Sequence, residues 1–273
     1  MLSLAIVALG FQSAQSCCMP TMSAFAADPA FATAHLEPLP LAWRAAEGHA
    51  VTWRAADGKP TSGFFVDAGK DVHQAVVLVH EFWGLNDYIR REAERLHEKT
   101  GYAVLAIDLY EGQVATKRGD AIKYMQGVDE MRGKAICQSA VDVLRAGKLG
   151  IHATKVGTVG FCFGGGWSFQ TAVLGGDKVQ ACVVFYGVPD TRPEALAALK
   201  APVLFIHPLQ DKWITSELVA DFQKKMAETR HVVEVLHYDA GHAFANPSNP
   251  AYDQKSADAA WSKTLEFFER LLG

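Results

Sequence analysis

Six apolar runs alternate with helical patterns along this chain, and the alternation constrains the fold more than any other feature. Most of the runs carry no charge in their interiors, which is typical of strands buried on both faces of a sheet. Amphipathic segments separate the runs, so the pattern predicts βαβ units, a mostly parallel central sheet and helices on both faces. The runs are QAVVLVHE (74–81), YAVLAIDLY (102–110), KVGTVGF (155–161), VQACVVFY (179–186), PVLFIHP (202–208) and HVVEVLHYD (231–239).

A hairpin precedes these units. HAVTWRA (49–55) and TSGFFVD (61–67) flank the turn pair Asp57-Gly58, which is a strong hairpin signal. An antiparallel N-terminal hairpin at the edge of a mostly parallel sheet is the pattern of the α/β-hydrolase fold. We therefore expect one domain over 46–273, with a single helical stretch over 119–146. An Ala/Pro-rich arm over 17–45 should lie on this domain, and DPAFATAHLEP (28–38) predicts a short helix within it.

The first sixteen residues predict an export signal. MLSLAIVALGFQSAQS holds an uncharged apolar run followed by Ala14-x-Ser16, a spacing that signal peptidase accepts. Residues 1–16 would then be cleaved and the protein would be periplasmic or secreted; without a signal it would be cytoplasmic. The lack of Lys or Arg near Met1 leaves a buried N-terminal helix or a misassigned start open. Lipidation of Cys17 is weakly supported, because Ala14 stands where a lipoprotein box favours an aliphatic residue.

Composition excludes several classes of protein. The net charge is −4, the pI is near 6.2 and no Lys/Arg run occurs, which argues against a nucleic-acid surface. Nothing past residue 20 is apolar enough to span a membrane. The five cysteines form no C-x-x-C pair, so a redox role has little support. We expect a monomer or small homo-oligomer that acts on a small molecule, without a cofactor or a metal.

A glycine-rich turn follows the third apolar run and places Cys162 where a nucleophile would stand. In GFCFGGGWS (160–168), Gly160 and Gly164 lie two residues before and after the cysteine. A sharp strand-to-helix turn that exposes a nucleophile needs small residues at these positions. The helix N-terminus should lower the pKa of the thiol, and the N–H of Phe163 should bind an oxyanion. A phosphate-binding loop or a purely structural cysteine are the alternatives.

Two later loops supply partners in the chain order that this fold requires. Asp211 follows PVLFIHP and His242 follows HVVEVLHYD, both at the carboxyl edge of the predicted sheet. His242 would take the thiol proton and Asp211 would orient the imidazole. Glu81 ends an earlier strand and points toward the same edge, although a salt bridge or helix cap would also explain it.

Five motifs follow one another along the chain: HEFWGLN (80–86), IDLY (107–110), GFCFGG (160–165), QD (210–211) and AGHAF (240–244). Together they resemble the dienelactone hydrolase family. The resemblance implies an α/β-hydrolase fold, a Cys162–His242–Asp211 triad, a Glu81 that holds the resting thiol, and a second oxyanion donor at the N–H of Phe82.

The resemblance also implies a site for the substrate carboxylate, which the type member of the family grips with two arginines. Arg118 falls where one arginine is expected, but Asn246 stands where the second should follow the catalytic histidine. Loss of a charge-assisted contact weakens carboxylate recognition by roughly 1–3 kcal/mol. An apolar mouth is expected to be lined by Trp83, Tyr110, Phe161 and Phe163, although a place in the core would also explain Phe161.

The sequence thus predicts thiol-dependent hydrolysis of small activated esters or lactones, of the enol-lactone or aryl-ester type, through a thioester acyl-enzyme. Two other classes stay open. The chain could be a non-catalytic binding protein on a hydrolase fold, or a thiol- or redox-active exported protein.

Overall fold

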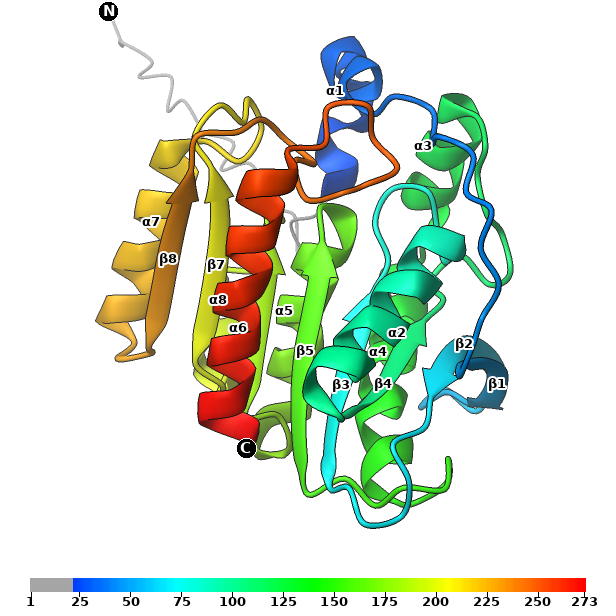
Figure 1. The fold of residues 1–273 in the computed structure, drawn as a ribbon. Helices are drawn as coiled ribbons and strands as arrows, with labels where there is room; N and C mark the ends of the chain where they lie inside the picture. Colours follow the sequence, from blue (N-terminus) through cyan, green and yellow to red (C-terminus); the bar gives the residue numbers. More distant parts are fainter. Residues whose placement is uncertain (1–21) are drawn as a thin grey trace, which may run out of the picture.

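A computed structural model describes residues 22–273, so the predicted signal, Cys17 and Cys18 lie outside the described residues. One eight-stranded sheet runs through the molecule in the order β1-β2-β4-β3-β5-β6-β7-β8 (Figure 1). The β1–β2 and β2–β4 pairs are antiparallel and the others are parallel, which confirms the predicted α/β-hydrolase fold. The strands are β1 His49–Arg54, β2 Pro60–Val66, β3 Gln74–Val79, β4 Ala103–Ile107, β5 Lys155–Phe161, β6 Ala181–Phe185, β7 Val203–Pro208 and β8 Val233–Tyr238.

Helices cover both faces of the sheet. α2 and α8 pack on one face, while α4 and α5 pack on the other, where α7 joins them through ring contacts of Phe222 (Figure 1). Every residue of β4, β6 and β7 is buried between these layers. The helices of the domain are α2 Asp87–Thr100, α3 Arg118–Gly127, α4 Glu130–Arg145, α5 Phe163–Gly175, α6 Pro193–Ala198, α7 Ser216–Glu228 and α8 Gln254–Leu272, with a 3₁₀ turn, η2, at Gly176–Lys178.

The single helix predicted over 119–146 is wrong, because two helices occupy this stretch. Val128 leaves the helical region with ψ 110°, and Asp129 then caps the second helix by accepting a hydrogen bond from the N–H of Arg132 at 2.8 Å. A carboxylate at this position satisfies an N–H group that the first helical turn leaves unpaired. The break lets α3 rise toward the carboxyl ends of the strands while α4 stays packed on the sheet (Figure 1).

The arm before the hairpin crosses the carboxyl ends of the strands (Figure 1). It contains a 3₁₀ helix, η1 (Met22–Ala27), and a short helix, α1 (Pro29–Ala34), which Asp28 caps through the N–H of Ala30 at 2.8 Å. We call residues 22–41 the N-terminal arm. Across residues 22–273, no helix is both long and apolar enough to traverse a bilayer.

Candidate active site

Cys162 occupies a strained turn between β5 and α5. Its φ of 52° and ψ of −115° are sparsely populated for a residue with a side chain. The chain can adopt this turn because the residues two positions before and two positions after Cys162 are glycines, whose backbones approach closely. A Cβ on Gly160 would lie 2.0 Å from the carbonyl oxygen of Gly164, and one on Gly164 would lie 2.3 Å from that of His80.

His242 and Asp211 extend from the loops after β8 and β7 and form a connected chain with the thiol. The Nε2 atom of His242 lies 3.2 Å from Sγ of Cys162, and Nδ1 donates to Oδ2 of Asp211 at 2.6 Å. The other Asp211 oxygen accepts from the N–H groups of Trp213 at 2.9 Å and Ile214 at 3.0 Å. These bonds fix the carboxylate, which in turn fixes the orientation of the imidazole.

Burial determines the protonation state of these groups. It raises the pKa of the Cys162 thiol well above its usual value, a negative charge on Glu81 raises it further, and the N–H of Phe163 lowers it only in part. The prediction that the helix N-terminus lowers the thiol pKa is therefore wrong for the buried Cys162. Burial also acts to raise the pKa of Asp211, but His242 and the two loop N–H groups outweigh it and lower this pKa.

Glu81 lies in the turn after β3 and is almost fully buried, with 4% of its surface exposed. One carboxylate oxygen of Glu81 accepts a hydrogen bond from the N–H of Trp83 at 3.2 Å. The Cys162 thiol contacts His242 and His35 instead of this carboxyl group. Desolvation raises the pKa of Glu81 to about 8, although the N–H groups of Trp83 and Phe82 lower it in part. In this structure, the Phe82 N–H expected to bind an oxyanion thus faces the Glu81 carboxyl group.

The expected substrate contacts are only partly assembled. Tyr110 is buried and donates from its hydroxyl to the carbonyl of Phe82 at 3.2 Å, and Trp83 is buried beside them. Asn246 is also buried, but its Oδ1 accepts from the N–H and hydroxyl of Ser248 at 2.9 and 2.7 Å. Arg118 begins α3, and within residues 22–273 no hydrogen bond or ion pair joins it to the triad.

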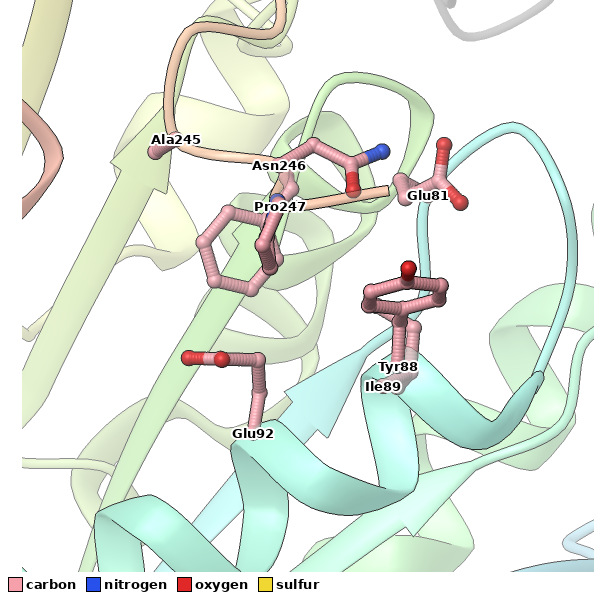
Figure 2. Close-up of a pocket in the computed structure, with 8 residues that line it drawn as sticks. Glu81, Tyr88, Ile89, Glu92, Ala245, Asn246 and Pro247 are labelled. Atoms are coloured by element: carbon pink, nitrogen blue, oxygen red, sulfur yellow. The ribbon is translucent and has the colours of Figure 1, made fainter. Parts of the chain in front are cut away.

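A small cavity borders the site, and Figure 2 shows Glu81, Tyr88 and Asn246 around it. Its volume of about 10 Å³ matches a single water molecule rather than an ester. The lining residues are Glu81, Tyr88, Ile89, Glu92, Phe161, Ala245, Asn246 and Pro247.

Comparison with known proteins identifies the family. The model of the dienelactone hydrolase family matches residues 64–272. This chain belongs to the dienelactone hydrolase family. Among its relatives, "Putative carboxymethylenebutenolidase" of Aquifex aeolicus is 31% identical over 206 residues, covering 72% of this chain and 88% of that protein.

Two other similar proteins extend the comparison. "Protein usf" of Aquifex pyrophilus is 33% identical over 205 residues, which cover 72% of this chain and 88% of that protein. A dienelactone hydrolase-like promiscuous phosphotriesterase from metagenomic libraries has a solved structure with a TM-score of 0.71 at 26% identity. That match covers 83% of this chain and all of the solved one.

The N-terminal arm lies before the residues that match the dienelactone hydrolase family, yet it contacts the nucleophile. Nε2 of His35 lies 3.5 Å from Sγ of Cys162, and both side chains are buried. Phe31 is fully buried, with its ring 5.3 Å from that of Trp213 and 6.2 Å from that of His242. The indole N–H of Trp213 in turn donates to Asp28 at 3.1 Å. The arm therefore closes over the triad.

Sequence reasoning missed His35 and Phe31 as parts of this site. The Asp28-Pro29 pair signals the start of a helix, and that signal predicts α1. It carries no information about which surface the helix contacts, since the residues that His35 and Trp213 meet are more than one hundred positions away.

We expect Glu81 to make the folded protein less stable as the pH rises. Between about 4.5 and about 8, an unfolded chain releases the Glu81 proton while the folded chain retains it, so the free energy of unfolding falls with pH. Glu81→Gln should remove this loss, which amounts to roughly 3–5 kcal/mol for a shift of this size. Urea unfolding below pH 4.5 and above pH 8 measures the change in the free energy of unfolding.

Glu98→Gln, at an exposed position, is the matched control and should keep the parent's pH dependence. An unchanged pH dependence in Glu81→Gln would contradict the assignment.

Proposed function

We propose that this chain hydrolyses small activated esters or lactones through Cys162, His242 and Asp211. The main support is an unbroken chain of contacts. Sγ of Cys162 lies 3.2 Å from Nε2 of His242, and Nδ1 of His242 lies 2.6 Å from Oδ2 of Asp211. Membership of the dienelactone hydrolase family supports cleavage of an ester or lactone bond. Relatives with the name carboxymethylenebutenolidase support the lactone in particular.

The first half of the reaction forms a thioester. His242 accepts the thiol proton through Nε2 while Sγ adds to the substrate carbonyl carbon, and the carbonyl electron pair moves to oxygen. The N–H of Phe163, which already faces the sulfur, stabilises the oxyanion; the N–H of Phe82 joins it once Glu81 releases that group. The C–O bond then breaks, and the leaving oxygen takes the proton from His242.

The second half uses water in the same way. His242 removes a proton from a water molecule that attacks the thioester carbon, and the proton then returns to Sγ as the carboxylic acid leaves. Asp211 stays ionised throughout, because it accepts three hydrogen bonds and its pKa lies below the usual value. It stabilises the imidazolium in both halves.

Glu81 acts on the thiol through its charge. A negative charge on Glu81 raises the pKa of Cys162, so the protonated form of Glu81 favours thiolate formation. With a pKa of about 8, Glu81 is mostly neutral at neutral pH. We propose that this carboxyl group holds the resting site in its thiol form when it ionises.

Binding of substrate to this chain should depend less on a substrate carboxylate than it does in an enzyme with two arginines at the site. Asn246 is neutral and its oxygen is committed to Ser248, while no ion pair connects Arg118 to the described site. We therefore propose neutral aryl esters and lactones as the preferred class.

A thiol nucleophile favours leaving groups of low basicity. The tetrahedral intermediate expels either the thiolate or the alkoxide, and a thiolate is the better leaving group than an ordinary alkoxide. A phenyl ester of a given acid should therefore react faster than its ethyl ester by about 10²-fold or more in kcat/KM. Spectrophotometric rates on the two esters measure the ratio, and the corresponding anilide should be inert. Equal rates on the two esters would show that the choice between expelling the thiolate and expelling the alkoxide does not limit the rate.

A further inference from the structure

The side chains of Cys162, His242 and His35 meet where the N-terminal arm covers the triad, and they carry more lone pairs than one thiol proton can satisfy. Nδ1 of His242 carries the proton that it donates to Asp211, and Nδ1 of His35 donates to the carbonyl of Phe31 at 2.7 Å. Each neutral ring then presents an unprotonated Nε2 to the same sulfur, at 3.2 and 3.5 Å. The single S–H of Cys162 can donate to only one of them.

Moving the thiol proton to His242 does not resolve the conflict. The thiolate then faces the second lone pair, that of His35, because the His35 ring proton stays on Nδ1, where the carbonyl of Phe31 accepts it. A cation bound between the three atoms would satisfy the thiolate and both nitrogens at once.

We propose that Cys162, His242 and His35 form a three-ligand site for a borderline-soft cation of the Zn²⁺ type. The three ligand atoms lie within 4.8 Å of one another, and all three residues are buried. Tetrahedral zinc with Zn–S near 2.3 Å and Zn–N near 2.0–2.1 Å needs ligand atoms about 3.3–3.6 Å apart. The two Sγ-to-nitrogen distances are already close to this range.

The surroundings of the rings fit the same chemistry. Histidines that bind zinc usually donate their second ring N–H to a carboxylate or a backbone carbonyl, which are the partners of His242 and His35 here. Charge also balances, since the thiolate and the Asp211 carboxylate together neutralise a divalent cation. Binding displaces the thiol proton to solvent and leaves a fourth position for water.

One ligand comes from the N-terminal arm and two come from the domain. A bound cation would therefore tie the arm to the site and occupy the nucleophile. The sequence predicts no metal site, because His35 is remote from the other two ligands along the chain.

Zinc binding to the full chain, measured without substrate, tests the site. Equilibrium dialysis should give one Zn²⁺ per chain, and competition with a chromogenic chelator should give its affinity. His35→Ala and His35→Gln should each weaken binding by at least about 10-fold. His237→Ala is the matched control, because His237 is an exposed histidine that pairs with His207 at 2.9 Å outside the cluster, and it should bind as the parent does.

The Co²⁺ spectrum of the unsubstituted chain adds a readout that depends on no variant. Tetrahedral d–d bands with a thiolate-to-metal charge-transfer band support the site. Sub-stoichiometric Zn²⁺ in the parent, parental affinity in folded His35 variants, or a Co²⁺ spectrum without the thiolate band would each overturn it. Because these readouts need no turnover, an inactive esterase would leave them unaffected.

Discussion

Replacing Cys162 with alanine is expected to reduce kcat/KM for a phenyl ester by about 10⁴-fold or more. The thiol is the only group in the Cys162–His242–Asp211 chain of contacts that can form the thioester, so its loss removes both halves of the reaction. Iodoacetamide should inactivate the parent enzyme and leave the residual rate of the variant unchanged. Hydrolysis at the parental rate in Cys162→Ala would rule out the proposed function.

Two further variants sharpen this test. Cys137→Ala is the matched control, because Cys137 is also a buried free thiol but lies in α4, and it should retain activity. Cys162→Ser should keep some activity with a much smaller ratio of phenyl to ethyl ester rates, because a serine alkoxide and an alkyl leaving group partition nearly evenly. An unchanged ratio in Cys162→Ser would show that the sulfur does not set the leaving-group preference.

Gly160→Ala should destabilise the protein by about 3 kcal/mol or more. The added Cβ would lie 2.0 Å from the carbonyl oxygen of Gly164, and backbone on both sides of the turn prevents a small adjustment. The strand and helix must separate to relieve the clash, which also displaces Cys162 from His242. Thermal and urea unfolding measure the loss of stability.

The control for this substitution is Gly127→Ala at the end of α3. No atom lies within 4 Å of a Cβ built there, so its free energy of unfolding should change by about 1 kcal/mol at most. If Gly160→Ala matched this control in stability and activity, the close approach of Gly160 to Gly164 would not be required for the turn.

The features that the sequence predicts correctly are those that depend on residues close together along the chain. Buried strands show as apolar runs, and the Cys162 turn shows as glycines at fixed spacing, so the fold and the turn follow from local pattern. The helix break at Val128 was missed because Asp129 reads equally well as a solvent-facing residue within one long helix. The capping bond that gives Asp129 its role appears only in the folded chain.

Properties that depend on burial by distant segments could not be read in the same way. The dipole of α5 acts to lower the thiol pKa, but burial of Cys162 outweighs it and raises this pKa. Part of that burial comes from Phe31 and His35, which pack over the site together with contacts such as Asp28 with Trp213, 185 positions apart. The sequence gives no register for such contacts, unlike the pairing of adjacent strands.

The N-terminal arm should also limit the fraction of molecules that can bind substrate. Cys162 is 1% exposed beneath Phe31 and His35, so we expect an ester to reach the thiol only when the arm is displaced. The fraction of open molecules multiplies kcat/KM for every substrate alike. We therefore expect changes in the arm that alter only this fraction to scale the overall rate and to keep the ranking of substrates, whereas changes at Cys162 should alter the ranking itself.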